Sequence, residues 1–491
     1  MVLPEAFQAF VEASPVSVMF RGTLEHVFAS ERLDQLFARV AVRQCCGELA
    51  FSTCAELLGL VVSQTRPSVH AAYRASREKI AVSVQSLYNK LAGIEPCVSE
   101  ALVRETARDL AEIIRALHAE QPGPLPGWDV RIVDGNHLAG TQHRLKELRR
   151  LGDAALPGHT LAVLNPHLEL IEAVRVCEDG HANQKPLLVE LLDMIQAGQC
   201  WIADRNFSTL PFLFGIHGRK AYFLIRQHAV LEGEAISVRR CLGRGDTGVV
   251  YEQPLRLSHE GDSLVVRRIT VELDQPTRDK DTEIHLLTNL PSQVNGRQIA
   301  RGYQSRWGIE AAFAKLTTVL RCELNTLGYP DAALFGFCLA VVMYNAVSTV
   351  MAALRTAHPQ LRRSEKGTSS SPEVGAKRSA GTRVSQRRGT ESTQPRLSFY
   401  YLADEIAGIW RGMAIAIRTE HWTAAFAHQT PNQLAKLLLW LARRTHVDQF
   451  LANPYRPQQR RKPRPMTTTG HHVSTYQLLQ SRKTLPRRKT K

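Results

Sequence analysis

The spacing of apolar residues divides the chain into helical and strand-like segments. Up to about residue 120, apolar positions recur at helical intervals, most clearly over residues 33–40 and 101–117. This pattern predicts a helical N-terminal domain over residues 1–120. Residues 121–127 then contain three prolines and two glycines, which interrupt both helices and sheet ladders. A second domain is therefore expected to begin just beyond them.

Short apolar runs after this boundary predict a sheet. Residues 130–133 and 200–203 are rich in β-branched and aromatic residues, and an aspartate follows each run directly, Asp134 and Asp204. Further strands are expected at residues 160–164, 168–176 and 221–225, with a helix at 185–195. The sequence thus predicts an α/β domain with a mixed sheet over residues 128–350. Chain direction places both aspartates at the carboxyl ends of their strands, where open α/β sheets bind ligands.

Alternation of apolar and polar residues between about 228 and 290 predicts a β-rich insertion into this domain. A glycine-rich stretch, residues 243–248, is predicted to be a hairpin turn. Five arginines of the insertion are candidates for lining DNA, although charged strand faces are also commonly just solvated: Arg239, Arg240, Arg244, Arg267 and Arg268.

A later helix carries a polar, reactive face. At about 100° per residue, Tyr303, Arg306 and Glu310 fall within a wedge of roughly 60°. An ordinary solvated face with an Arg/Glu pair has the same spacing, but the two upstream aspartates favour a functional site. The adjacent stripe is apolar and is expected to be buried against the sheet: Ile309, Phe313, Leu316 and Leu320.

Three carboxylates, Asp134, Asp204 and Glu310, would offer the oxygen ligands that Mg²⁺ or Mn²⁺ prefers. We expect two such ions. A pair about 4 Å apart activates a water or a DNA 3′-hydroxyl and stabilises the leaving oxygen of a phosphodiester. The sequence therefore predicts metal-dependent phosphodiester chemistry.

The signature Tyr303-x2-Arg306-x3-Glu310, with Asp204-Arg205-Asn206-Phe207 and Asp134-Gly135-Asn136, resembles DDE transposases of the IS4 family of insertion sequences over about residues 125–350. The resemblance implies a ribonuclease-H-like core with Asp134, Asp204 and Glu310 as catalytic, metal-holding residues.

The resemblance also implies the partners. The protein would cleave double-stranded DNA at the terminal inverted repeats of its element and join the ends to target DNA, as a homodimer in the synaptic complex. Tyr303, Arg306 and Arg205 are expected to contact this DNA. The expected location is the prokaryotic cytoplasm, on the nucleoid when DNA is bound.

One position departs from the family signature. Its lysine would fall at Thr317, and Lys315 lies about 140° from Glu310 around the helix. Arg321, eleven residues from Glu310, returns to within about 20° of the reactive face if the helix continues that far. We therefore expect Arg321 to contact a phosphate.

A hairpin intermediate is left open by the sequence. Relatives that form one can use a tryptophan of the insertion to trap a flipped base, but no tryptophan lies between Trp201 and Trp307. Tyr251, at the centre of the insertion, is physically able to stack on a base in its place.

The N-terminal domain contains two helical stretches, residues 68–74 and 82–91, compatible with a small DNA-binding unit. Polar side chains of the second stretch can reach bases or phosphates: Gln85, Ser86, Tyr88 and Asn89. By resemblance this domain recognises transposon ends, although an ordinary helical domain gives the same pattern.

Beyond the core, residues 332–354 predict an apolar core helix, with Asn345 and Ser348 arguing against a membrane role. Residues 356–398 form a basic, weakly hydrophobic segment predicted to be a disordered linker. Helical periodicity returns over 399–447. No acidic residue follows Asp448, so residues 448–491 are predicted to be a basic disordered tail.

Composition narrows the possible partners. The 491 residues carry a formal net charge of +16, which suits a polyanion such as DNA. Nine cysteines without a Cys-x2-Cys pair favour reduced thiols over a zinc site or disulfides. Neither a signal sequence nor an uninterrupted bilayer-length apolar segment is evident, so no membrane partner is expected. His137 and His181 are candidate ligands or proton carriers, or simply solvated turn residues.

Two alternatives to a transposase remain open from the sequence. One is a related metal nuclease that cleaves DNA without joining it. The other is a non-enzymatic DNA-binding protein derived from a transposase.

Overall fold

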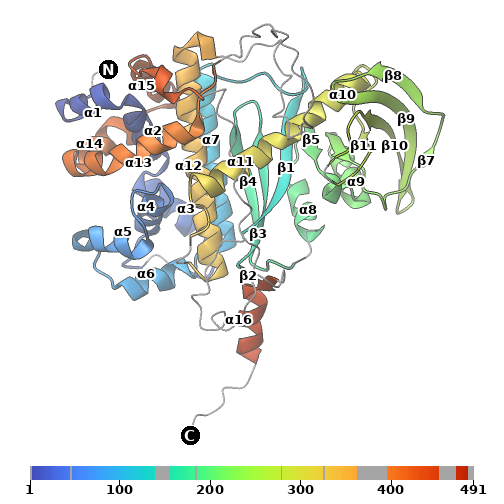
Figure 1. Cartoon of the computed structure of the whole chain (residues 1–491). Coiled ribbons are helices and arrows are strands. Elements are labelled where there is room, and N and C mark those ends of the chain that lie inside the picture. Colours follow the sequence, from blue (N-terminus) through green and yellow to red (C-terminus); the bar gives the residue numbers. More distant parts are fainter. Residues whose placement is uncertain are drawn as a thin grey trace, which may run out of the picture.

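The computed structural model describes residues 3–44, 47–138, 154–182, 185–277, 279–324, 327–361, 395–452 and 472–484. A mixed sheet occupies the centre of the molecule (Figure 1). Helices from both ends of the chain pack together on one side of it, and the β-rich insertion lies on the other side. Two regions far apart in sequence therefore share one helical layer.

The N-terminal part is helical, as its periodicity predicted. The helices expected at 33–40 and 101–117 are α3 and α7, and the two stretches of the predicted DNA-binding unit are α5 and α6, capped by the hydroxyls of Ser68 and Ser83. The elements are η1 Glu5–Phe7, α1 Gln8–Ala13, α2 Pro15–Val27, α3 Ser30–Val40, α4 Phe51–Val62, α5 Val69–Ala75, η2 Arg77–Lys79, α6 Val84–Leu91 and α7 Pro96–Ala116.

Five strands form the core half of the sheet, in the order β4-β3-β1-β5-β6. Strands β1, β3 and β4 pair antiparallel, whereas β1, β5 and β6 pair parallel. The predicted α/β class with a mixed, ribonuclease-H-like sheet is therefore confirmed. The elements are β1 Asp129–His137, β3 His159–Asn165, β4 Leu170–Cys177, α8 Lys185–Leu192, β5 Gln199–Ala203, η3 Arg205–Phe207, α9 Leu210–Gly218 and β6 Tyr222–Arg226.

Each face of this sheet belongs to a different hydrophobic core because side chains alternate along a strand. Ile132 lies in a core shared with the helices of both chain ends, whereas its neighbour Val133 lies in a second core with α8 and α9. Strand β1 is thus covered on both faces, which explains why the neighbouring residues Ile132 and Val133 are both apolar.

The insertion extends the central sheet instead of forming a separate one. Strand β11 pairs antiparallel with β6, opposing Leu287 to Ile225, so the whole sheet has ten strands. The predicted turn connects β8 to β9, where the Gly245 N–H donates to the Gly248 carbonyl over 2.8 Å. The strands are β7 Glu234–Ala235, β8 Arg240–Arg244, β9 Gly248–His259, β10 Asp262–Leu273 and β11 Glu283–Thr288.

A nearly continuous helical segment links the insertion to the helical layer, crossing the sheet diagonally (Figure 1). It consists of α10 Gly296–Tyr303, the 3₁₀ turn η4 Gln304–Arg306 and α11 Trp307–Thr318. The predicted apolar stripe is buried, with Ile309 and Leu316 fully enclosed. The reactive face is therefore anchored from the opposite side of its own helix.

Helix α12, Pro330–Ala357, is the central helix of the helical layer. In the described part of the chain it is the one helix long and apolar enough to cross a membrane, so the expectation that no segment would qualify is wrong by that test. Its apolar window is entirely buried inside the fold, as in a core helix. Buried Asn345 accepts from the Ile171 N–H and donates to the Ile171 carbonyl, both over 2.9 Å, which fixes α12 to edge strand β4.

The C-terminal helices complete the layer against α2, α7 and α12. They follow η5 Pro359–Leu361 and comprise α13 Phe399–Ala416, α14 Thr419–Trp422, the π-helical turn η6 Thr423–Ala427, α15 Pro431–Ala442 and η7 Val447–Phe450. Most of the predicted disordered linker, residues 362–394, lies outside the described residues.

The prediction of a wholly disordered tail is wrong for residues 472–484. They form β12 His472–Ser474, paired parallel with β2 Ala154–Leu156, and α16 Thr475–Thr484. The Ser474 hydroxyl donates to Asp179 over 2.6 Å, and the Gln477 amide donates to the same carboxylate over 2.9 Å. These long-range contacts explain why composition alone misjudged the segment.

Candidate active site

The parallel pairing of β1 with β5 brings the two predicted aspartates to one edge of the sheet. Ile132 opposes Ile202, so Asp134 and Asp204, each two residues further on, reach the same level. Asp204 follows β5 directly, whereas Asp134 lies within β1, opposite Ala162 of β3. The register of the two strands therefore places Asp134 and Asp204 side by side.

Neighbouring backbone and amide groups fix the orientation of each aspartate. The Gly135 N–H donates to Asp134 Oδ1 over 2.8 Å. Asn206 donates twice to Asp204, from its N–H to Oδ1 over 2.9 Å and from Nδ2 to Oδ2 over 3.2 Å. Asp204 also caps the 3₁₀ turn η3 in this way.

Arg306 bridges the strand and helix carboxylates. Its Nη1 donates to Asp134 Oδ2 over 3.2 Å, and its Nη2 lies 2.6 Å from Glu310 Oε1. The Arg306 side chain is only 11% exposed, compared with 39% for Glu310. Helical spacing of four residues places Arg306 and Glu310 side by side, and Asp134 meets them from the sheet. The predicted wedge is thus present, with the arginine between two acids.

Electrostatics at this edge show an excess of negative charge. Burial, together with the nearby charges of Asp204 and Glu310, raises the pKa of Asp134 to about 6, against the opposing effects of Gly135 and Arg306. Burial raises the pKa of Tyr303 to about 12, so its hydroxyl stays protonated beside Arg306 and can donate. One arginine thus compensates a cluster of three acids.

The donor chemistry of the cluster fits a hard divalent cation, because all three side chains offer carboxylate oxygens. Among the residues that the structure describes, however, no three acidic, histidine or cysteine side chains stand close enough together to enclose a metal ion. The Arg306 guanidinium takes the position between Asp134 and Glu310. The three carboxylates lie near one edge of the sheet, and this guanidinium lies between two of them.

The helix that was to bring Arg321 back to the reactive face does not continue that far. Helix α11 ends at Thr318, and Arg321 has a positive φ of 40° beyond its end. The condition on which the expected phosphate contact of Arg321 rested is therefore not met, and the contact itself stays a prediction without that helical basis. Thr317 donates its hydroxyl to the Phe313 carbonyl over 2.7 Å. Lys315 faces Tyr344 of α12, as its 140° offset required.

The remaining predicted residues lie at or beyond the rim. Arg205 is exposed and pairs with Asp279 of the insertion over 3.4 Å. The His137 ring lies 5.5 Å from His159 at the end of β1. The His181 backbone N–H donates to Asp179, the carboxylate that holds the C-terminal segment. His181 therefore belongs to a structural cluster.

Three residues at this edge escaped the sequence-based reasoning. Asn206 orients Asp204, and its Asp-x-Asn spacing was the available signal. Arg226 ends β6 just as Asp204 follows β5, pairs with Asp281 over 2.6 Å and influences the pKa of Tyr303. Trp307 is 60% exposed beside the reactive face, with the Arg306 guanidinium 4.9 Å from its ring centre.

The insertion arginines proposed to line DNA are mostly engaged by the protein itself. Arg267 donates to Glu252 and to three backbone carbonyls, and Arg268 donates to Gln253. Arg239, Arg240 and Arg244 form ion pairs with acidic residues of neighbouring strands. Tyr251 donates to Glu272 over 2.9 Å and stacks with Arg239 at 3.9 Å. The centre of the insertion is thus an internally balanced surface.

The mixed sheet and its helices have a ribonuclease-H-like arrangement, with Asp134, Asp204 and Glu310 near one edge of the sheet. Residues 128–346, less than half of the chain, match the family model described as Transposase DDE domain. No curated protein matches the chain. The matched segment contains Asp134, Asp204 and Glu310, and it supports a DDE transposase.

Proposed function

We propose that this protein is a DNA transposase of the IS4 type. It would cleave DNA at the ends of its own element and join those ends to target DNA. The proposal is supported by the contacts of Arg306 with Asp134 and Glu310, and by the charge of Asp204 acting on Asp134, within a segment similar to transposase DDE domains.

Asp134, Asp204 and Glu310 would hold Mg²⁺ or Mn²⁺. Such ions acidify a water or a DNA 3′-hydroxyl and stabilise the leaving oxygen of the phosphodiester. Asn206 keeps both oxygens of Asp204 oriented, so that carboxylate needs little reorganisation. Arg306 would exchange its contacts with Asp134 and Glu310 for a DNA phosphate, since guanidinium binds phosphate in the same bidentate manner as carboxylate.

Other residues of the edge would position DNA. The protonated Tyr303 hydroxyl is a hydrogen-bond donor for a phosphate oxygen. Trp307 presents an exposed ring beside the carboxylates, and exposed aromatic rings stack on nucleic-acid bases. Arg226 and Arg205 would add positive charge from the sheet edge and its rim. Synapsis of two ends would require at least two copies of the chain on DNA.

The test is a cleavage and strand-transfer assay on a linear duplex carrying the ends of the element. Parent protein should nick the ends with Mg²⁺ and join pre-cleaved ends to a target plasmid. Asp204→Asn should lose both reactions by at least about 10³-fold, because the variant removes a metal-holding charge. Asp262→Asn, an exposed acid at the β9–β10 turn, is the matched control and should retain activity.

Other outcomes separate the alternatives. Metal-dependent nicking without joining of pre-cleaved ends would favour a nuclease. Duplex binding by the parent without cleavage under any divalent metal would favour a non-enzymatic DNA-binding protein, and would contradict the proposal.

A further inference from the structure

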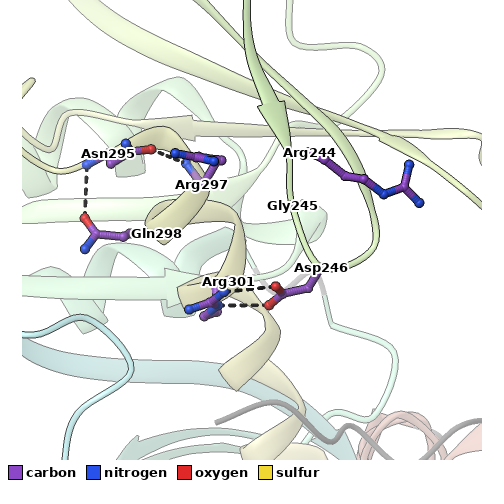
Figure 2. Close-up of a pocket in the computed structure, with 7 residues that line it drawn as sticks. All are labelled: Arg244, Gly245, Asp246, Asn295, Arg297, Gln298 and Arg301. Carbon is purple, nitrogen blue, oxygen red and sulfur yellow. Dashed lines mark hydrogen bonds and ion pairs between the residues drawn. The ribbon is translucent and has the colours of Figure 1, made fainter. Parts of the chain in front are cut away.

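A basic cavity lies at the start of α10, whereas Glu310 lies further along the same helical segment, on α11. It has a volume of about 380 Å³ and lies between the β8–β9 turn and the first turns of α10 (Figure 2). Three arginines line it, Arg244 from the sheet and Arg297 and Arg301 from the helix, together with a single acid, Asp246. The lining therefore carries a net positive charge.

Its arginines differ in how far the protein already satisfies them. Arg301 is held by Asp246 through two contacts of 2.9 and 3.0 Å. Arg244 reaches Asp274 over 2.6 Å at an exposed position. The Arg297 side chain is exposed and has no hydrogen bond or ion pair with any residue that the structure describes. Arg297 is thus an available guanidinium beside two others, unlike the saturated Arg267.

The backbone beneath Arg297 is rigidly placed. Asn295 accepts from the Arg297 N–H over 2.9 Å, while the Asn295 N–H donates to the Gln298 side chain over 3.2 Å, so a capping box closes the start of α10. Gly296 packs closely on the insertion, because a Cβ there would lie 2.4 Å from Leu242 Cδ1. The Arg297 backbone N–H already donates to Asn295, so a ligand in the cavity would be bound mainly by the guanidinium groups.

The cavity and the carboxylates lie along one helical segment. Glu310 is thirteen residues beyond Arg297, a span of roughly 20 Å at about 1.5 Å per residue. Phosphates of one DNA strand follow the duplex axis at about 3.4 Å intervals. A duplex running along α10 and α11 would therefore place a phosphate near the cavity about six base pairs from the phosphate at the carboxylates. Because six base pairs rotate a duplex of about 10.5 base pairs per turn by more than half a turn, the phosphate that faces the cavity belongs to the opposite strand.

We propose that this cavity binds a backbone phosphate of the duplex on which the carboxylates act, with Arg297 as its principal contact. The inference rests on the proposed function and adds a second anchoring point, which would fix the direction of the DNA along α10 and α11. Arg244 and Arg301 would surround the phosphate with positive charge while keeping their carboxylate partners.

The first experiment measures duplex binding by the full-length chain as a function of salt, using an end duplex and no divalent metal. Loss of one phosphate contact should lower the slope of log affinity against log salt by about 1. We expect Arg297→Gln to show this change and to keep the parent melting temperature. Arg240→Gln is the matched control, because Arg240 is an exposed arginine of the same insertion that pairs with Glu252 outside the cavity.

The second experiment replaces single phosphates of the duplex with uncharged methylphosphonates. One replacement, about six base pairs from the cleavage position, should weaken binding by the parent about three- to tenfold and leave Arg297→Gln unaffected, as expected for two partners of one contact. Equal responses of parent and variant at every position, or an unchanged salt slope, would overturn the inference.

Further outcomes separate this inference from the proposed function. If the parent cleaves ends and Arg297→Gln behaves like the parent, the cavity assignment fails and the function stands. If the parent never cleaves but the Arg297-dependent methylphosphonate effect is present, the activity fails and the phosphate contact stands. If millimolar inorganic phosphate raises the melting temperature of the parent but not of Arg297→Gln, with no methylphosphonate effect, the cavity binds free phosphate and the DNA assignment is wrong.

Discussion

The insertion and the acidic edge of the core handle charge in opposite ways. In the insertion, basic and acidic side chains lie in cross-strand pairs, such as Arg239 with Glu272 and Glu283 on β10 and β11. At the edge, Arg306 pairs with both Asp134 and Glu310, and the charge of Asp204 also acts on Asp134. The first region is balanced by its own residues, and the second is not.

This difference shows where a ligand's charge would be accommodated. Paired charges on a sheet face fix strand register and leave little attraction for a further ion. An unbalanced cluster of acids is costly. The pKa of Asp134 is raised mainly by burial, and the charges of Asp204 and Glu310 raise it further. Cations or a rearranged arginine would relieve the cost of the cluster. An abundance of arginine alone therefore does not indicate which surface could bind DNA, because most arginines of the insertion already have acidic partners.

The largest effect on stability is expected for Arg267, a paired arginine of the insertion. Arg267 is largely buried and donates to Glu252 and to the carbonyls of Leu290, Pro291 and Val294. Arg267→Ala should lower the free energy of unfolding by about 3–5 kcal/mol, because Glu252 and the carbonyls lose their buried partner. Urea unfolding followed by circular dichroism measures this. A loss under about 1 kcal/mol would mean that the pair is not structural.

The next largest effect is expected at the acidic edge, where Arg306 lies between Asp134 and Glu310. Arg306→Ala should lower cleavage about 10²-fold, as for loss of one positioned donor to a reacting group. Without its guanidinium, Asp134 and Glu310 repel one another, so the metal-free variant should melt earlier. Mg²⁺ should then raise its melting temperature more than that of the parent, because the ion no longer competes with the arginine. An equal or smaller rise in the variant would contradict this role of Arg306.

Local periodicity was sufficient for much of the fold and for the carboxylate cluster. Asp134 and Asp204 follow from strand direction, and Arg306 and Glu310 follow from the 3.6-residue helical repeat. The helical position expected for Arg321 was not reached, and nothing in residues 318–320, neither glycine nor proline, signals the end of α11. The C-terminal segment failed because its order depends on contacts with Asp179, almost 300 residues earlier. Side-chain pairing in the insertion depends on strand register, which composition does not contain.

A third charge arrangement, two acids in contact, gives a pH-dependent effect of intermediate size. Burial, followed by a hydrogen bond and the charge of Glu178, raises the pKa of Asp331 well above its ordinary range, although Arg43 opposes this and Glu95 adds to it. Folded protein therefore keeps a proton that the unfolded chain releases near pH 4. The free energy of unfolding should fall as the pH rises from about 4 into the neutral range.

Asp331→Asn tests the assignment, because an amide keeps a hydrogen-bond donor toward Glu178 without titrating. Urea midpoints measured across this pH range should fall in the parent and stay flatter in the variant. Equal slopes would show that the pair does not hold the proton. A rise with pH in the parent alone would reverse the sign and contradict the raised pKa.

The smallest expected effect is the most direct test of the comparison itself. Arg239 belongs to the insertion, where its guanidinium is engaged by Glu272 and Glu283 and stacks on Tyr251. Exposed pairs of this kind contribute less than about 1 kcal/mol, so Arg239→Gln should change the free energy of unfolding by no more than that.

Since the charge of Arg239 is already compensated, the salt dependence of duplex binding by Arg239→Gln should also stay at the parent value. When Arg239→Gln is measured beside Arg297→Gln under the same conditions, each variant removes one positive charge, from the insertion and from the adjoining helix α10 respectively. If Arg239→Gln lowers the salt slope as much as Arg297→Gln does, pairing within the protein does not decide which arginines meet DNA.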